Sequence, residues 1–217
     1  MSVMHRRPPS LTRRGVLLGL ALTGFVAAPS VLRAATLDDV GKPIAELNAG
    51  LLQAMRAGTK TAFASRFEAL TPLVDRAFDL PGILRASVGQ HWTGLVEQDR
   101  SDLQDIFRRF TIASYVASFN AFDGERFELL PELRAVGTDQ VVGTLLVPAT
   151  GEPIRLDYVM RQQDGVWRAV DVLADGTISR VAVQRSDFRA LLAQGGVRAL
   201  IGSLQKKLAD LSGGSLV

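Results

Sequence analysis

The sequence predicts an α+β domain, in which a curved antiparallel sheet of four or five strands is packed by helices around an apolar cavity. The first observation is that apolar residues recur every three or four positions from residue 36 to about residue 122. The second is that after Asp123-Gly124 they recur every two positions. Helical spacing returns after Ser186, and this order of elements is typical of the α+β class.

The first half of the chain contains candidate helices with recognisable starts. Asp38 and Asp39 lie where the first turn of a helix favours acidic side chains. In Asp79-Leu80-Pro81, Asp can cap free amides and Pro is tolerated in the first turn. A longer helix is expected at 95–119, and its nearly uncharged second half predicts burial on most sides. The apolar positions of the first and second helices are Leu37, Val40, Ile44, Leu47 and Leu51, then Phe63, Phe67 and Leu70.

The second half of the chain predicts hairpin strands followed by helices. Asp164-Gly165 and Asp175-Gly176 are typical of tight hairpin turns. Ser186 is expected to cap a helix that Gly195-Gly196 breaks, and 197–208 forms the final amphipathic helix. The predicted strands cover 126–136, 140–147, 154–161, 166–173 and 177–183.

The basic character of the chain is concentrated at its start. The whole sequence of 217 residues has a net charge of +3. Residues 1–34 hold five arginines and no acid, which leaves 20 basic and 22 acidic residues in the remainder. An apolar run at 15–28 follows Arg13-Arg14, so 1–34 is expected to be a secretory signal peptide of the twin-arginine kind. An uncleaved anchor is the alternative for this segment. We expect a working domain at 35–211 that is exported, and a flexible tail at 212–217.

The composition argues against several kinds of chemistry. The chain has no cysteine and two histidines, of which His5 lies in the predicted signal and His91 stands beside Trp92. No nucleophile elbow, phosphate loop or metal-ligand spacing is present, so we expect no metal, no cofactor and no enzymatic activity. The slightly acidic remainder, with basic pairs only at Arg108-Arg109 and Lys206-Lys207, argues against nucleic-acid binding.

Large apolar side chains are the feature that remains, and they suggest an elongated pocket between the helices and the sheet. The alternative for each of them is an ordinary place in a filled core. The candidate lining residues are Phe107, Phe110, Tyr115 and Phe119 from helices, and Leu145, Leu156, Tyr158, Trp167 and Ile178 from strands.

Two further hypotheses stay open. The first is a small-molecule enzyme on a cone-shaped fold of the NTF2-like kind, which would use Asp171 or Asp157 with Tyr158. Against it, strand alternation predicts that Asp157 faces solvent, and Asp171 could simply accept hydrogen bonds from a nearby loop. The second hypothesis is a structural adaptor for a membrane complex, which needs no cavity.

Several stretches resemble the exported lipid-shuttle family known as MlaC, or toluene-tolerance auxiliary proteins of ABC transporters. Their order and spacing carry the resemblance, which covers about residues 37–208. These stretches are Phe78-Asp79-Leu80 with Val88-Gly89-Gln90-His91-Trp92, Phe107-Arg108-Arg109-Phe110 with Tyr115, Ile154-Arg155-Leu156-Asp157-Tyr158 with Trp167-Arg168-Ala169-Val170-Asp171-Val172, and Asp175-Gly176-Thr177-Ile178-Ser179 with Arg185-Ser186-Asp187-Phe188.

Within that family, residues 110–115 and 183–188 look most like the hopanoid-associated HpnM branch. The resemblance implies an α+β fold with a deep apolar pocket. It also implies a periplasmic, non-catalytic carrier of a phospholipid or hopanoid that works with an inner-membrane transporter of the RND or ABC type. We expect the carrier to be a monomer.

Overall fold

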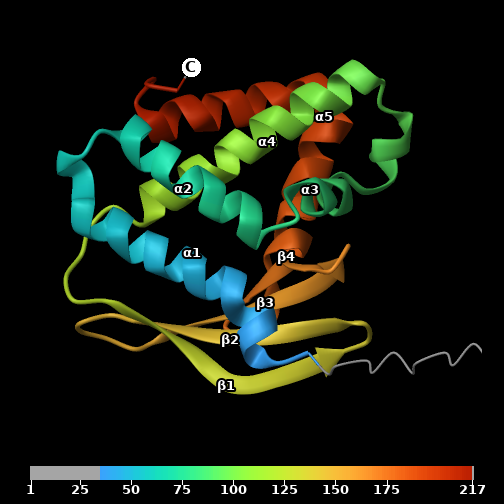
Figure 1. The fold of residues 1–217 in the computed structure, drawn as a ribbon. Coiled ribbons are helices and arrows are strands. Elements are labelled where there is room, and N and C mark those ends of the chain that lie inside the picture. Colours follow the sequence, from blue (N-terminus) through green and yellow to red (C-terminus); the bar gives the residue numbers. More distant parts are fainter. Residues whose placement is uncertain (1–34, 217) are drawn as a thin grey trace, which may run out of the picture. The chain divides into compact units, whose positions relative to one another are not determined.

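The computed structural model describes residues 35–216, so the predicted signal peptide at 1–34 lies outside the described residues. In this part of the chain, helices lie on one face of an open antiparallel sheet, and the α+β class is confirmed (Figure 1). The helices are α1 (Leu37–Ala57), α2 (Phe63–Ala77), α3 (Leu80–Val88), α4 (Glu97–Ser118) and α5 (Arg180–Ser212), with 3-10 turns at Gly58–Lys60 and Gly89–Gly94. The strands are β1 (Arg126–Val136), β2 (Asp139–Val147), β3 (Ile154–Gln163), β4 (Val166–Ala174) and β5 (Ile178–Ser179).

The strands form a simple meander, in which each strand pairs antiparallel with the next one along the chain. The β3–β4 hairpin turns at Asp164-Gly165, where φ is +51° and +79°. Positive φ at both central residues matches the twist of the flanking strands, which is why Asp-Gly favours this turn. At the free edge of the sheet, the pairing of β1 with β2 is irregular between Leu129 and Leu133. Pro131, which has no N–H to donate, lies in this interval.

The predicted strand at 177–183 is wrong beyond its first residues. β5 covers only Ile178–Ser179, and α5 begins at Arg180 rather than after Ser186. The Ser179 hydroxyl accepts a hydrogen bond from the Ala182 N–H at 2.9 Å, so it provides the N-terminal cap that we assigned to Ser186. The predicted break at Gly195-Gly196 is confirmed, because both glycines have non-helical angles inside α5.

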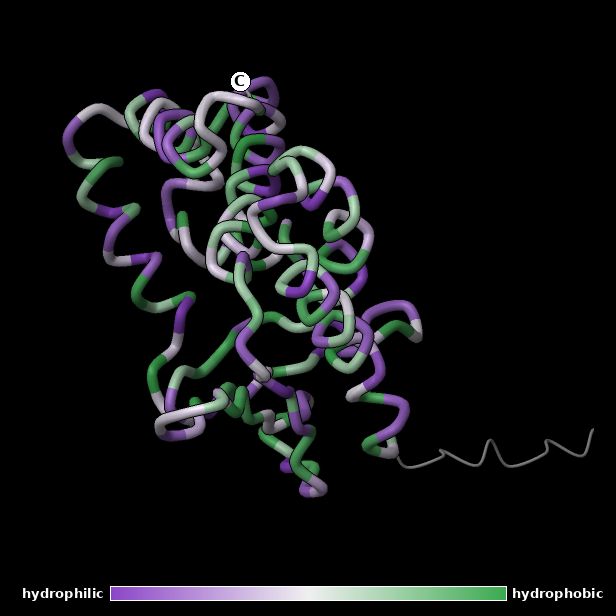
Figure 2. The backbone as a smooth tube through the Cα atoms, turned by 90° about the vertical axis from the view of Figure 1, so that its left-hand side faces the viewer, coloured by the Kyte–Doolittle hydropathy of each residue, from purple (hydrophilic) through white to green (hydrophobic). Residues whose placement is uncertain are grey.

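The helical layer is amphipathic, and in Figure 2 hydrophobic and hydrophilic residues alternate along each coil. The buried sides of α1, α2, α3, α4 and α5 join one hydrophobic core that includes the sheet residues Val142, Tyr158 and Met160. α1 and α2 approach closely at Gly50, where an added Cβ would lie 2.0 Å from the Leu73 Cδ1 atom. A larger residue at this position would push the two helices apart.

The tail predicted at 212–217 makes specific contacts in its described part. Gly213 ends α5 in a left-handed conformation, and the Gly214 N–H donates to the Ala209 carbonyl at 2.9 Å. The Arg109 guanidinium of α4 donates to the Leu216 carbonyl. The Leu216 side chain is partly buried against the core. The composition of the tail gave no indication of these contacts.

A buried arginine links α2 to the end of α4. Arg66 is only 6% exposed, and its guanidinium donates to the Val116 carbonyl at 3.1 Å and to the Thr61 carbonyl at 3.2 Å. Carbonyl groups in the last turn of a helix lack partners within the helix and carry partial negative charge. Arg66 therefore satisfies the end of α4 where it packs against α2.

We predict that Arg66→Ala lowers the free energy of unfolding by about 1–3 kcal/mol, because it leaves the Val116 carbonyl buried without its donor. The matched control is Arg76→Ala on the same helix. Arg76 is exposed and lies 3.6 Å from Glu46, so its loss should cost less than about 0.5 kcal/mol. Urea unfolding of the two variants checks this, and equal costs would contradict the role of Arg66.

Candidate functional site

The candidate site is the face of the sheet that is turned toward the helices. Cross-strand partners share a face, and Leu129 on β1 pairs with Thr144 on β2, which pairs with Leu156 on β3. The orientation of this face is fixed by Gly41 of α1. An added Cβ at Gly41 would lie 2.9 Å from Leu129 and 3.7 Å from Val142. The face that carries Leu129, Leu156 and Val142 therefore points toward α1.

This inner face is covered only in part by the helices. Val142, Tyr158 and Met160 on the middle strands are fully buried. Other apolar residues of the inner face, together with two aromatic residues of α4, remain partly exposed, and we call them the inner apolar surface. It consists of Phe127, Leu129, Leu133, Leu156 and Val172 from the strands, and Tyr115 and Phe119 from α4. Buried and partly exposed apolar side chains thus lie side by side on this face, and the apolar cavity expected between the layers stays a prediction.

A continuous line of aromatic rings connects the core with this surface. Phe78, between α2 and α3, lies 6.2 Å from Tyr158 and 5.7 Å from Tyr115, measured between ring centroids. The Tyr115 ring stacks on Phe119 at 6.1 Å, and Phe119 lies 5.9 Å from Phe127 of β1. These separations are typical of favourable aromatic pairs. Segments distant in sequence therefore build one continuous aromatic wall.

The tyrosine hydroxyls are the polar groups of this wall. Burial raises the pKa of Tyr158 well above its ordinary value of 10.0. Burial also raises the pKa of Tyr115 well above 10.0, and the nearby Tyr158 adds to the shift while the positive charge of Arg180 opposes it. Both side chains therefore stay neutral at physiological pH and can donate or accept a hydrogen bond.

The structure brings some of the predicted lining residues together and separates others. Tyr115, Phe119, Leu156 and Tyr158 lie on or beside the inner apolar surface. Phe107 is buried in the core against Phe188, at 6.3 Å between ring centroids.

The remaining four predicted lining residues lie elsewhere. Trp167 is partly buried against the core on β4. Phe110 lies 5.9 Å from Lys207 of α5 and borders a small cavity of about 330 Å³ between α4 and α5. Leu145 pairs with Arg155 on the opposite face of the sheet, and Ile178 is 52% exposed on β5.

Asp157 is buried, and the prediction that it faces solvent is wrong in this respect. It lies on the outer face of the sheet, as the alternation predicted, but it is only 1% exposed. Arg155 donates to it at 2.9 Å and Arg134 at 3.3 Å, and the stems of these long side chains cover the carboxylate. Tyr158, its proposed catalytic partner, points to the other face.

Asp171 anchors the start of α5. Its carboxylate accepts hydrogen bonds from the Val172 N–H at 2.7 Å, the Val181 N–H at 3.1 Å and the Ser179 hydroxyl. A carboxylate at a helix N-terminus is favoured by the free N–H groups and by the helix dipole. Of the two hypotheses for Asp171, a catalytic acid or an acceptor of hydrogen bonds from a nearby loop, these contacts match the second.

Sequence reasoning missed three residues in or near the site. Phe127 and Phe78 complete the aromatic wall, and Phe127 could have been found from the two-residue alternation of Phe127 and Leu129 in β1. Asn48 is buried among the apolar positions of α1. A polar residue among the apolar positions of a helix is the sequence signal that points to Asn48.

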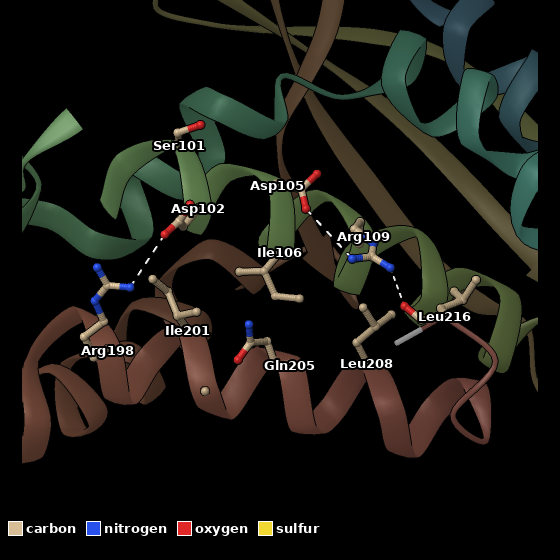
Figure 3. Close-up of a pocket in the computed structure, with 11 residues that line it drawn as sticks. Ser101, Asp102, Asp105, Ile106, Arg109, Arg198, Ile201, Gln205, Leu208 and Leu216 are labelled. Carbon is tan, nitrogen blue, oxygen red and sulfur yellow. Dashed lines mark hydrogen bonds and ion pairs between the residues drawn. The ribbon is translucent and has the colours of Figure 1, made fainter. Parts of the chain in front are cut away.

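A second concave region lies between α4 and α5. It has a volume of about 820 Å³, and Figure 3 shows its apolar floor of Ile106, Ile201 and Leu208 between the two helices. Charged pairs border it, with Arg198 3.6 Å from Asp102 and Arg109 4.0 Å from Asp105. This groove is lined by residues of α4 and α5 together with Leu216, and no strand residue borders it.

The described residues carry few features of other kinds of site. No group of three or more histidine, cysteine, aspartate or glutamate residues within 35–216 is arranged to hold a metal ion. Over the same part of the chain, no helix is both long and apolar enough to cross a membrane. The candidate site among the described residues is therefore the apolar, partly exposed sheet face with its two neutral tyrosines.

Comparison with known proteins identifies the family. The model of the MlaC protein family matches residues 46–206, so this chain belongs to the MlaC family. A solved structure with the same fold is the phospholipid-binding protein from Ralstonia solanacearum in complex with a phospholipid. It matches with a TM-score of 0.69 at 20% sequence identity, over 82% of this chain and 99% of that chain. No curated protein sequence matches this chain significantly.

We predict that the folded protein forms no tyrosinate near pH 10, where tyrosine ordinarily titrates, because burial raises the pKa of both of its tyrosines. The unfolded chain releases these protons near pH 10, so stability is unaffected below that pH and falls as the pH rises above it. Near-ultraviolet absorbance during an alkaline titration checks this. Tyrosinate that appears near pH 10 while the circular dichroism stays native would contradict it.

We predict that Asp171→Asn lowers the free energy of unfolding by about 1–2 kcal/mol, because the charge at the start of α5 is lost. Asp187→Asn, at an exposed position of α5, is the control and should change stability by less than about 0.5 kcal/mol. Thermal unfolding of both variants measures the difference. Equal stabilities would argue against an anchoring role for Asp171.

Proposed function

We propose that this protein is a non-catalytic carrier that binds a single lipid on the inner apolar surface. The observation that carries the proposal is the partial exposure of aromatic and aliphatic side chains that face the helices. Membership of the MlaC family supports it. The phospholipid bound by the structural neighbour supports a lipid as the ligand.

The energetics of lipid transfer suit this role. Each methylene group moved out of water contributes about 0.8 kcal/mol, so a lipid leaves a membrane for water very slowly. An apolar protein surface that takes the place of the membrane lowers the free-energy barrier to removing the lipid from the membrane. Release then requires an acceptor that favours the open or lipid-free state of the carrier.

We further propose that the carrier works in the periplasm. The arginine-rich start and apolar run of residues 1–34 support export by the twin-arginine route. The acceptor or donor would be an inner-membrane transporter of the RND or ABC type, and a hopanoid is proposed beside a phospholipid as cargo. The resemblance of 110–115 and 183–188 to the HpnM branch supports these details.

We predict that Leu156→Gln reduces the lipid that remains bound after purification by at least about tenfold, because a buried amide without partners opposes apolar contact. Leu145→Gln is the matched control, since Leu145 is also a half-buried strand leucine but lies on the outer face. Lipid extraction and native mass spectrometry of both variants, with the wild type alongside, give the measurement. Equal loss in both variants would locate binding away from the inner apolar surface.

A further inference from the structure

One polar side chain in the core of the helical layer has no partner. Asn48 lies in the middle of α1 and is only 4% exposed. Neither its Nδ2 atom nor its Oδ1 atom has a hydrogen-bond partner among the described residues. Buried amides are nearly always satisfied, because an unpaired donor or acceptor loses its bonds to water without compensation. This residue therefore destabilises the ligand-free fold.

The position of Asn48 on α1 directs it toward the sheet. Seven residues make almost two full turns, so Gly41, Asn48 and Met55 lie along one side of the helix. Gly41 marks the side that meets the sheet, through its close approach to Leu129. Gly50, on the opposite side, meets Leu73 of α2 instead. Asn48 thus lies on the side of α1 that is turned toward the sheet, and its amide is closed off from water in the ligand-free structure.

The chemistry of the orphan group limits what it could bind. An amide side chain is neutral and offers both donors and an acceptor. Since both ends of this amide are unpaired, a group that donates and accepts at once satisfies it best. A hydroxyl group meets this condition, whereas an ester carbonyl only accepts and a phosphate brings a charge that a neutral amide does not balance.

We propose that Asn48 is a specificity residue that hydrogen-bonds a hydroxyl group of the lipid carried on the inner apolar surface. This inference rests on the proposed function and adds the class of lipid, namely one with a hydroxyl group on an otherwise apolar body. The bound hydroxyl completes the hydrogen bonds that Asn48 lacks in the ligand-free protein. An otherwise identical lipid without the hydroxyl leaves the amide unsatisfied and binds more weakly.

Two matched lipid pairs test the proposal and distinguish the sources of the hydroxyl. The first pair is the hopanoid alcohol diplopterol and its hydrocarbon counterpart diploptene, and the second is a diacylglycerol and its acetylated derivative. Competition against the fluorescent apolar probe N-phenyl-1-naphthylamine reports the affinity of each lipid. For at least one pair, we expect the wild type to bind the hydroxylated lipid about threefold to tenfold more tightly.

The variant Asn48→Leu should bind both members of that pair within about twofold, because one hydrogen bond is lost and the apolar contacts remain. Its lipid-free form should also unfold at a higher temperature than the wild type, since the orphan amide is gone. Gln53→Leu, at an exposed position of α1, is the control and should keep the discrimination of the wild type. Asn48→Ser, which restores a donor and an acceptor, should regain part of it and provides a second variant if leucine disturbs folding.

Each contrary outcome has a distinct meaning. If the wild type binds both members of both pairs equally, or if Asn48→Leu keeps the discrimination of the wild type, the recognition role is overturned while the lipid-carrier function stands. If the wild type binds none of the four lipids and carries no lipid after expression, both proposals fail. A change in unfolding temperature with unchanged discrimination would show that Asn48 has only a structural effect.

Discussion

The central constraint on this fold is that an antiparallel meander offers one apolar face, which the helices have to cover. They cover it unevenly. α1 approaches the sheet closely at Gly41, while the outer part of the aromatic wall, which consists of Tyr115, Phe119 and Phe127, remains partly exposed. A fully sealed interface would give a more stable but inert domain. The incomplete cover leaves apolar side chains partly exposed, as the proposed function requires.

Charged groups in this protein hold elements together. Arg66 satisfies the end of α4, Asp171 fixes the start of α5, and Asp157 is enclosed by Arg134 and Arg155 on the outer face. These contacts occur at the junctions and at the back of the sheet. The inner face therefore carries apolar side chains and neutral polar groups. Such groups do not stabilise a buried charge.

The parts of the fold that could be predicted are those set by residues close together in the sequence, namely apolar periodicity and turn residues. The change in the spacing of apolar residues and the turn at Asp164-Gly165 were enough to predict an antiparallel sheet. The bounds predicted for β1, 126–136, are the observed ones. The face of Leu145 could not be deduced, because residues 141–147 are almost continuously apolar and show no alternation. The long-range contacts of Asp171, and the arginines that enclose Asp157, depend on tertiary packing that periodicity does not encode.

The placement of the tyrosines has an optical consequence. The whole chain contains two tyrosines and two tryptophans, and both tyrosines lie in the aromatic wall. Trp167 stands on β4 of the same sheet as Tyr158 and packs against the same hydrophobic core. The intrinsic ultraviolet emission of these residues therefore reports on the packing of the core without any attached dye.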